Sequence, residues 1–322
     1  MVDIPSPFRA VPQVRDSAFR VRLRRGWEIT GSVLANPTTV IGLVIIILMI
    51  GMALLAPILI EPNSPDPYQM PRDWGSPRKP PGTPGHPLGT TNNGGDVLYG
   101  VIWGARTSLY LSIVVVSITV TIGIIVGSLA GFLGGKVDEI LMRIVDVFLS
   151  IPELIFALAI AAVLGPSFGN IIFALAVVFW VKYARVMRAQ VIRVKQNDYI
   201  DAARVIGDSN IRIYFRDILP NAITPVMVQA TMDMGHVVLV AATLSFIGLS
   251  EAGIAEWGVL VSEGQAGISA GRWWASTFPG AMVFLWALAF NLVGDGLRDV
   301  LDPRTESTVF CTIAAAHDIH GA

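Results

Sequence analysis

Six blocks of mostly apolar residues, each about as long as a lipid bilayer is thick, dominate this chain. A helix needs about 20 consecutive apolar residues to cross the hydrocarbon core of a membrane. The blocks occupy residues 38–60, 109–133, 140–164, 170–186, 222–249 and 275–293. Only 15% of the residues are charged, whereas an ordinary soluble domain has about 25%. We therefore expect an all-α membrane protein with six transmembrane helices.

The orientation of these helices follows from the positions of Lys and Arg, because cytoplasmic loops carry an excess of basic residues. If the N-terminus is inside, 18 of the 23 Lys and Arg residues fall in cytoplasmic segments and five fall outside. This predicts that both termini are cytoplasmic. The basic run "RVRLRR" is interpreted as part of this topology signal, so no nucleic acid is expected as a partner. No cleavable signal peptide precedes the first block, which we expect to remain as an anchor.

The blocks divide the chain into segments. We expect a cytoplasmic N-terminal arm (1–37), a first transmembrane helix (38–60), an extracytoplasmic loop (61–108), a transmembrane core (109–297) and a cytoplasmic tail (298–322). The loop begins with nine Pro and three Gly in 27 residues, which predicts an extended strap without regular structure. After Asp96, apolar residues recur at helical spacing, which predicts a short interfacial helix before the second span.

The chain lacks the signature of a nucleotide-binding loop. In "AGFLGGKVDE", Ala130 stands where a P-loop has its first glycine, and Val137 replaces the Ser or Thr that would hold magnesium. The four histidines, His86, His236, His317 and His320, are scattered without metal-ligand spacing. Cys311 is the only cysteine. We expect no catalytic residue, metal or cofactor in this chain, although an intramembrane enzyme using a histidine in a span stays open as an alternative.

Four glycines follow one another at every fourth position of the second span: Gly123, Gly127, Gly131 and Gly135. This spacing places them on one helical face and lets a second helix approach closely, which is how helices associate in lipid. The partner helix is expected either within the same bundle or in a second membrane subunit.

Ionisable residues also occur within the spans. Arg143 and Asp146 are three residues apart in the third span and are expected to pair, while Pro152 is expected to bend that helix. Asp233 and His236 are three apart in the fifth span, where charged groups are tolerated only if they face protein or water. They are read either as part of a polar pathway or as a hydrogen bond to a neighbouring helix, and the sequence does not choose between them.

The longest cytoplasmic loop, at about residues 187–221, is several times longer than the 2 to 8 residues that usually join neighbouring helices. Its first half places Tyr199, Ala202, Ala203 and Ile206 on one helical face, and Gly207 is positioned as a helix stop. Asp201 is expected to point toward water. Pro220 limits how far a second helix continues before the fifth span.

Several ordered motifs of the chain resemble a known family. "DAARVIG", followed by "ILPN", is similar to the EAA loop of the membrane subunits of ABC importers, with Asp201 in place of the usual Glu. "HPLGT", "MRIVDVFLSIP", "GPSFGN", "LSFIGL" and "AFNLVGDGLRDVLDPR" extend the resemblance to the dipeptide/oligopeptide/nickel permease family, in its C-type subunit, over about residues 37–304.

The resemblance implies a type I ABC importer permease fold, in which the long loop docks onto a cytoplasmic ATP-binding subunit. The residues of this coupling contact would be Tyr199, Asp201, Ala202, Ala203, Gly207, Ile218, Leu219 and Pro220. The implied partners are two such subunits, which use ATP and Mg, a homologous second permease, an extracytoplasmic solute-binding protein and the lipid bilayer.

The implied cargo is a di- or oligopeptide, with nickel, an oligosaccharide or an opine-like solute as alternatives. A secondary transporter driven by protons through Asp233 and His236 is the alternative from another class.

Overall fold

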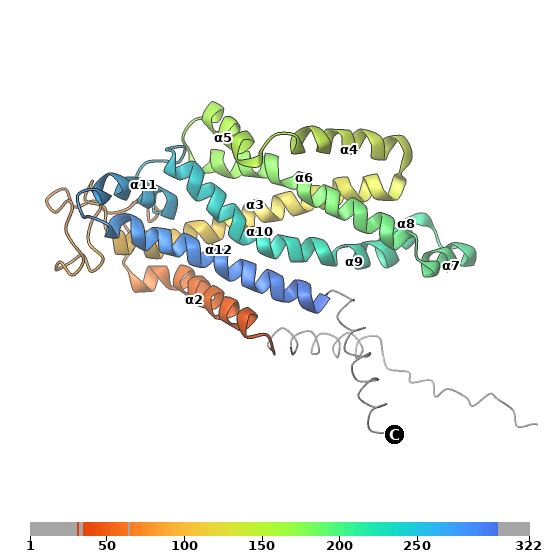
Figure 1. The fold of residues 1–322 in the computed structure, drawn as a ribbon, viewed down its shortest axis with the longest axis horizontal. Coiled ribbons are helices and arrows are strands. Elements are labelled where there is room, and N and C mark those ends of the chain that lie inside the picture. The colour runs from red at the N-terminus through yellow and green to blue at the C-terminus, as the bar shows by residue number, and fades with distance from the viewer. Residues whose placement is uncertain (1–30, 32–34, 64, 302–322) are drawn as a thin grey trace, which may run out of the picture.

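The computed structural model describes residues 31, 35–63 and 65–301, and these form a helical bundle (Figure 1). The helices are α2 (Pro37–Leu59), α3 (Val97–Leu133), α4 (Gly135–Leu149), α5 (Glu153–Leu164), α6 (Phe168–Lys195), α7 (Asp198–Ile206), α8 (Asn210–Ile213), the π-helix η1 (Tyr214–Ile218), α9 (Leu219–Ala222), α10 (Thr224–Phe246), α11 (Trp257–Ile268) and α12 (Trp274–Leu301). Within these ranges the extended backbone is limited to isolated bridges. Most of the predicted arm and tail, including Cys311, lies outside the described residues.

The number of membrane crossings follows from the direction of the helices. Five helices are long and apolar enough to cross, and α4 and α5 form a sixth candidate that is bent by 84°. Helices α3 and α6 run parallel, because Gly123 of α3 lies against Tyr183 of α6 while Gly131 lies against Val191. The chain must therefore cross back between them, and α4 together with α5 makes that crossing (Figure 1). The prediction of six transmembrane helices is confirmed.

The predicted bend at Pro152 is confirmed by the 84° angle between α4 and α5, but the helix does not continue through it, because the chain breaks there. Helix α4 ends at Leu149, and Pro152 begins α5 with extended backbone angles (φ −56°, ψ 125°). Proline has no N–H group to donate and disfavours helical geometry in the residue before it. Both effects act at Ile151 and Pro152, so the backbone leaves the helix completely there.

Helix α3 has 37 residues, beginning at Val97. The side chain of Asp96 caps it by accepting a hydrogen bond from the Tyr99 backbone N–H at 2.9 Å. At 1.5 Å per residue the helix is about 55 Å long, well beyond the roughly 30 Å of the hydrocarbon core. The separate interfacial helix predicted after Asp96 is wrong: these residues are the first turns of α3, and Trp257 of α11 donates to the Val101 carbonyl there.

The glycines of α3 bring its backbone against α6. A Cβ atom at Gly123 or Gly127 would collide with Tyr183 or with the Ala184 carbonyl, and one at Gly131 would lie 2.9 Å from the Arg188 carbonyl. The contact thus lies within this chain's own bundle. Gly135 does not belong to it, because it has φ +54° and nothing within 4 Å. The prediction for Gly135 is wrong, since α3 ends at Leu133 and the chain turns through Gly134 and Gly135 into α4.

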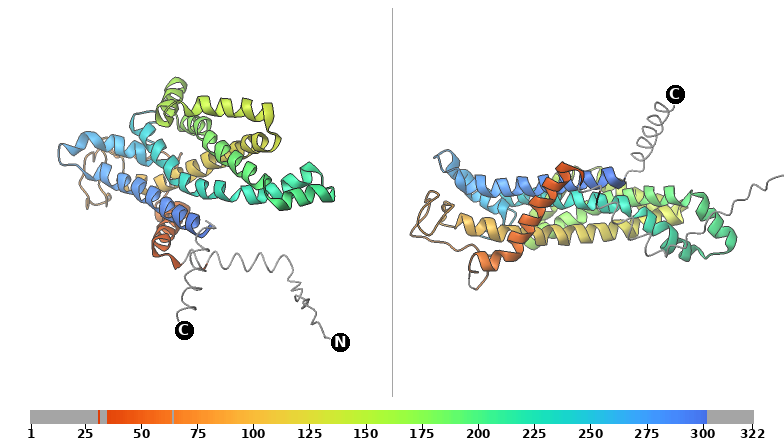
Figure 2. Two further views of the ribbon diagram at one scale, coloured as in Figure 1. Left: turned by 45° about the vertical axis from the view of Figure 1, so that its right-hand side comes forward. Right: turned by 90° about the horizontal axis from the view of Figure 1, so that it is seen from below.

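Helix α2 packs obliquely across α12 (Figure 2). The Thr39 hydroxyl is close to Gly296 of α12, and Gly42 faces the Ala289 carbonyl. The opposite side of α2 exposes large apolar side chains, among them Ile47, Leu48 and Ile58. That side of the bundle suits contact with lipid.

The strap before α3 is irregular, as predicted, and is packed onto the outer end of the bundle. Tyr99 donates to the Pro67 carbonyl at 2.5 Å, and the Met70 N–H donates to the Gly253 carbonyl at 2.9 Å. His86 lies 2.7 Å from Asp96 through Nδ1 and 3.7 Å from Asp73 through Nε2. The backbone N–H of Gly75 holds the pKa of Asp73 below its ordinary value.

We predict that Gly127→Ala destabilises the bundle because the added methyl group would overlap the α6 backbone. Overpacking of this kind costs about 1 to 3 kcal/mol, and it should appear as a lower unfolding temperature of the purified chain in detergent. Gly51→Ala is the matched control, since Gly51 is also helical but has nothing within 4 Å. Equal unfolding temperatures for the two variants would contradict the close contact.

Candidate functional site

The segment between α6 and α10 carries a group of exposed apolar side chains, which we call the tip surface: Tyr199, Val205, Ile206, Ile211 and Phe215. Val205 is 88% exposed and Ile206 is 83% exposed. Exposed apolar groups of this kind mark surfaces that bind other molecules. Helices α7 and α8, which carry most of these residues, lie at one end of the elongated chain (Figure 1).

Gly207 ends α7 at the tip surface. It has φ +95°, in the left-handed region where a side chain would be strained, and nothing lies within 4 Å of it. The N–H groups of Gly207 and Asp208 donate to the carbonyls of Arg204 and Ala203, which closes the helix end. Gly207 therefore turns the chain from α7 toward α8, whose cap is the side chain of Ser209.

The base of the loop is anchored in the core of the bundle. Ile200, Ile213 and Ile218 are buried and belong to the main apolar cluster. The predicted grouping on α7 needs correction at Ala203, which packs against this cluster, whereas Tyr199 and Ala202 are exposed. Sequence reasoning missed Ile200, although an isoleucine directly before Asp201 on a short charged helix is a signal for a single inward anchor.

The second half of the loop reaches α10 without leaving helical geometry. Helix α8 continues into the π-helix η1 and then into α9, which contains Leu219 and Pro220. A π-turn removes the regular i to i−4 hydrogen-bond pattern before Pro220, which has no N–H to offer. Leu219 is half-buried against the core and Pro220 is exposed.

Three ion pairs join α6 to α4 and α5. Arg188 binds both carboxylate oxygens of Asp138, at 2.5 and 2.6 Å. Arg185 pairs with Asp146. The predicted pairing of Arg143 with Asp146 is therefore wrong, because the acid is taken by an arginine from another helix.

The third ion pair is part of a triad of Glu153, Lys182 and His236. Glu153, at the first residue of α5, receives Lys182 Nζ at 2.7 Å on one oxygen and faces His236 Nε2 at 2.8 Å with the other. The Phe179 ring lies 4.4 Å from Lys182 Nζ and also contacts His236. The triad thus ties together α5, α6 and α10, the last two being the helices on either side of the loop.

Asp233 and His236 do not pair with each other. Asp233 is buried and accepts a hydrogen bond from Gln229 at 3.0 Å, one turn earlier on α10. His236 points to α5 instead and is partly exposed. Neither Glu153 nor its partner Lys182 was singled out in the sequence analysis. The signal for both was a charged residue at the edge of an apolar run.

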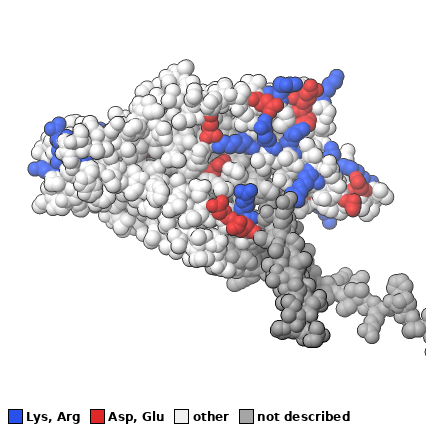
Figure 3. Space-filling view, viewed as in Figure 1, with Lys and Arg blue, Asp and Glu red and all other residues white. Residues whose placement is uncertain are grey.

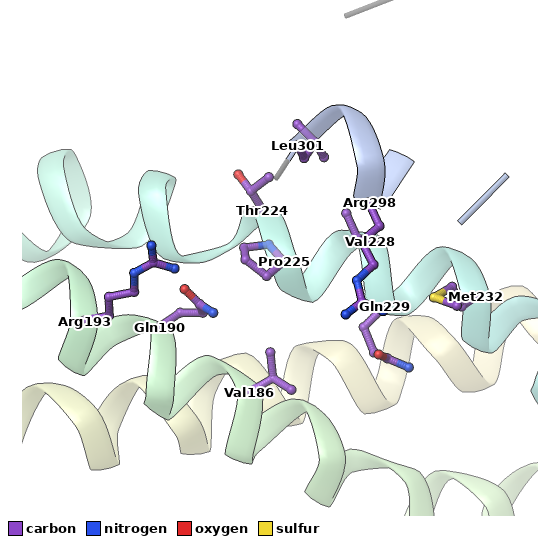
Figure 4. Close-up of a pocket in the computed structure, with 10 residues that line it drawn as sticks. All are labelled: Val186, Gln190, Arg193, Thr224, Pro225, Val228, Gln229, Met232, Arg298 and Leu301. Atoms are coloured by element: carbon purple, nitrogen blue, oxygen red, sulfur yellow. The ribbon is translucent and has the colours of Figure 1, made fainter. Parts of the chain in front are cut away.

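A cavity of about 480 Å³ opens between α6, α10 and α12 (Figure 4). Its polar lining consists of Gln190, Arg193, Thr224, Gln229 and Arg298. Val186, one turn from Lys182, also lines it. None of its lining residues is acidic.

The charged side chains of the face in Figure 3 gather over the half of the molecule that carries α7 and α8, with a separate basic group at the strap. Charges within membrane spans face protein or water, because lipid cannot solvate them. The half-exposed triad therefore marks a face that is turned away from lipid, in contrast to the outer side of α2.

The fold and these features define a class of protein: a multi-pass inner-membrane permease whose longest cytoplasmic loop carries exposed apolar side chains. The model of the binding-protein-dependent transport system inner membrane component family matches residues 123–307, and that of the N-terminal transmembrane domain of oligopeptide transport permease C matches residues 32–81. The chain belongs to the former family. It is a permease subunit of an ABC importer and is not itself an enzyme.

Curated relatives agree over most of their length. The dipeptide transport system permease protein DppC of Escherichia coli (strain K12) is 42% identical over 275 residues, which is 84% of this chain and 90% of the relative. The probable D,D-dipeptide transport system permease protein DdpC of the same organism is 41% identical, covering 86% and 90%. DppC of Alkalihalophilus pseudofirmus is 36% identical, covering 84% and 88%.

A solved structure supports the fold. The MetNI methionine ABC transporter in an inward-facing form contains a chain that aligns with a TM-score of 0.53 and 20% identity. The alignment covers 64% of this chain and 98% of that chain. The type I importer permease fold implied by the sequence motifs is thereby confirmed.

We predict that Glu153→Gln destabilises the chain by about 1 to 3 kcal/mol, because Lys182 and His236 would lose a charged acceptor. Asp146→Asn is the matched control: both partners of that pair are more than half exposed, and exposed ion pairs contribute at most about 1 kcal/mol. Thermal unfolding in detergent measures both effects. A larger loss of thermal stability for Asp146→Asn than for Glu153→Gln would contradict the triad as the stronger of the two links to α6.

Proposed function

We propose that this chain forms one half of the translocation path of an ABC importer for di- or oligopeptides and couples that path to ATP hydrolysis by partner subunits. The observation that carries the proposal is the tip surface, which is exposed at the end of the loop yet attached to buried anchors. The names of the curated relatives, which are dipeptide permeases, support peptides as the cargo.

Coupling follows from how the loop is held. The tip surface binds a cytoplasmic ATP-binding subunit, with Tyr199, Ala202 and Ile206 in the contact and Asp201 at its edge. Because Ile200, Ile213 and Ile218 are packed in the core, a displacement of the tip moves the ends of α6 and α10 with it. Two such subunits hydrolyse ATP with Mg, and this chain supplies the part that moves.

The path runs along the face that carries the triad. Helices α6 and α10 turn Lys182 and His236 toward Glu153, and the cavity continues from there between the same two helices. A homologous second permease closes the path from the opposite side. We place Asp233 and Asp146 next to this face: Asp233 is buried beside Gln229, and Asp146 pairs with Arg185, three residues after Lys182.

The outer end receives the solute-binding protein. The strap and α11 are packed together through Arg72 and Glu263, whose side chains lie 3.2 Å apart, and Asn92 donates to the Glu263 carbonyl at 2.9 Å. A delivery protein would thus meet a firm surface. Trp74, which is 73% exposed, is a large apolar group of the strap that such a protein could contact.

We predict that Ile206→Asp uncouples transport. The change places a charge in the contact with the ATP-binding subunit, and the loss of a central interface side chain costs about 2 kcal/mol or more, equivalent to at least tenfold. In proteoliposomes containing the complete transporter, peptide taken up per ATP hydrolysed should fall by at least about tenfold.

Ile206→Leu is the control and should leave this ratio near that of the unmodified protein, because it keeps the apolar surface. Gly207→Val and Ala202→Glu should act like Ile206→Asp. Normal coupling in all three disruptive variants would contradict the assignment of this loop as the contact with the ATP-binding subunit. Transport by the purified chain alone in a proton gradient, without any ATP-binding subunit, would favour a secondary transporter instead.

The cargo is tested with the same proteoliposomes. We expect ATP-dependent uptake of a radiolabelled dipeptide in the presence of the solute-binding protein, and no comparable uptake of nickel, an oligosaccharide or an opine. Preferred uptake of one of those three would correct the cargo and leave the coupling proposal standing.

A further inference from the structure

The cavity between α6, α10 and α12 contains two arginines that are not neutralised. Arg193 of α6 and Arg298 of α12 both line it, and neither side chain has an ion-pair or hydrogen-bond partner within residues 31, 35–63 and 65–301. Every other arginine of α6 is paired, namely Arg185 with Asp146 and Arg188 with Asp138. Two like charges on one cavity repel each other, so a bound anion would stabilise this arrangement.

The remaining lining fits a ligand with both polar and apolar parts. Figure 4 shows Gln190 and Arg193 extending from α6, and Arg298 extending from α12 toward Gln229 of α10. Val186, Val228 and Met232 supply apolar walls. A volume of about 480 Å³ lies in the range of roughly 300 to 1,000 Å³ that small-molecule sites occupy.

We propose that this cavity is a binding site for the C-terminal carboxylate of a peptide at the inner mouth of the path, with Arg193 and Arg298 as its anion-binding residues. The proposal rests on the proposed function. A guanidinium group matches a carboxylate by two parallel hydrogen bonds. The amide groups of Gln190 and Gln229 offer partners to the peptide backbone.

The position of the cavity favours a transported solute over a lipid headgroup. Val186 of α6 and Met232 of α10 line the cavity. Each lies about one helical turn from a residue of the triad, Lys182 on α6 and His236 on α10. Those two residues are half-exposed charged or polar groups at membrane depth, where a lipid-facing position would be unfavourable. The cavity therefore opens on the face assigned to the path.

The test measures binding of a peptide to the complete transporter in detergent, without the solute-binding protein, by isothermal titration calorimetry. A dipeptide with a free carboxylate should bind at least about tenfold more tightly than the same dipeptide with a C-terminal amide, because charge-assisted bonds to arginine are lost in the amide. Arg193→Gln and Arg298→Gln should each weaken binding of the free acid by at least about tenfold.

Arg143→Gln is the matched control, since Arg143 is an exposed arginine on α4 outside the cavity, and it should leave binding unchanged. The comparison of acid and amide on the unmodified complex needs no variant, so it stands even if a variant fails to assemble. Equal binding of the two peptides, no peptide binding, or binding of short-chain phosphatidylglycerol in place of the peptide would overturn the proposal.

The same preparation separates this inference from the proposed function. If the unmodified complex imports the dipeptide with the solute-binding protein but binds acid and amide equally, only the carboxylate site is wrong. If it imports no peptide, the cargo assignment itself fails.

Discussion

The close contact between α3 and α6 is the constraint on which the rest of the bundle depends. Lipid gives two apolar helices no hydrophobic reason to associate, so they need backbone-to-backbone packing, and Gly123, Gly127 and Gly131 allow it. Because the two helices are parallel, the chain must return across the membrane between them. The broken pair α4 and α5, the ion pairs on α6 and the direction in which α6 enters the loop all follow from that arrangement.

The ion pairs show how the bundle accommodates charge within the membrane region. The three basic residues Lys182, Arg185 and Arg188 are spaced by three along α6, and each meets an acid from α4 or α5. Neutralisation by a neighbouring helix lowers the cost of placing these groups near lipid. The series ends at Arg188, which pairs with Asp138 near the start of α4, and Arg193 lies further along α6, where it lines the cavity.

The sequence was sufficient for the number and direction of the spans, the long loop and the α7 stop, because these depend on local properties: block length, the distribution of Lys and Arg, and a glycine at a helix end. It was insufficient where a tertiary contact competes with a local one. Arg143 and Asp146 satisfy the spacing rule for a helical pair, yet Arg185 takes the acid. Asp233 and His236 obey the same spacing, yet one turns to Gln229 and the other to Glu153. The cavity depends on three helices that are far apart in the chain, so no local pattern could indicate it.

The π-helix at Tyr214–Ile218 makes the length of the loop as important as its composition. It holds one more residue per turn than an α-helix would, and each residue of an α-helix turns the chain by about 100°. The π-turn absorbs one extra residue, so deleting a single residue within it would restore regular winding with little change in orientation, whereas deleting a residue from the α-helical turns on either side would rotate the tip surface by about that angle relative to α10. The number of residues between the tip surface and α10 therefore sets how the surface is rotated about the helix axis. Insertions and deletions in the α-helical turns change that rotation even where every side chain of the surface is kept.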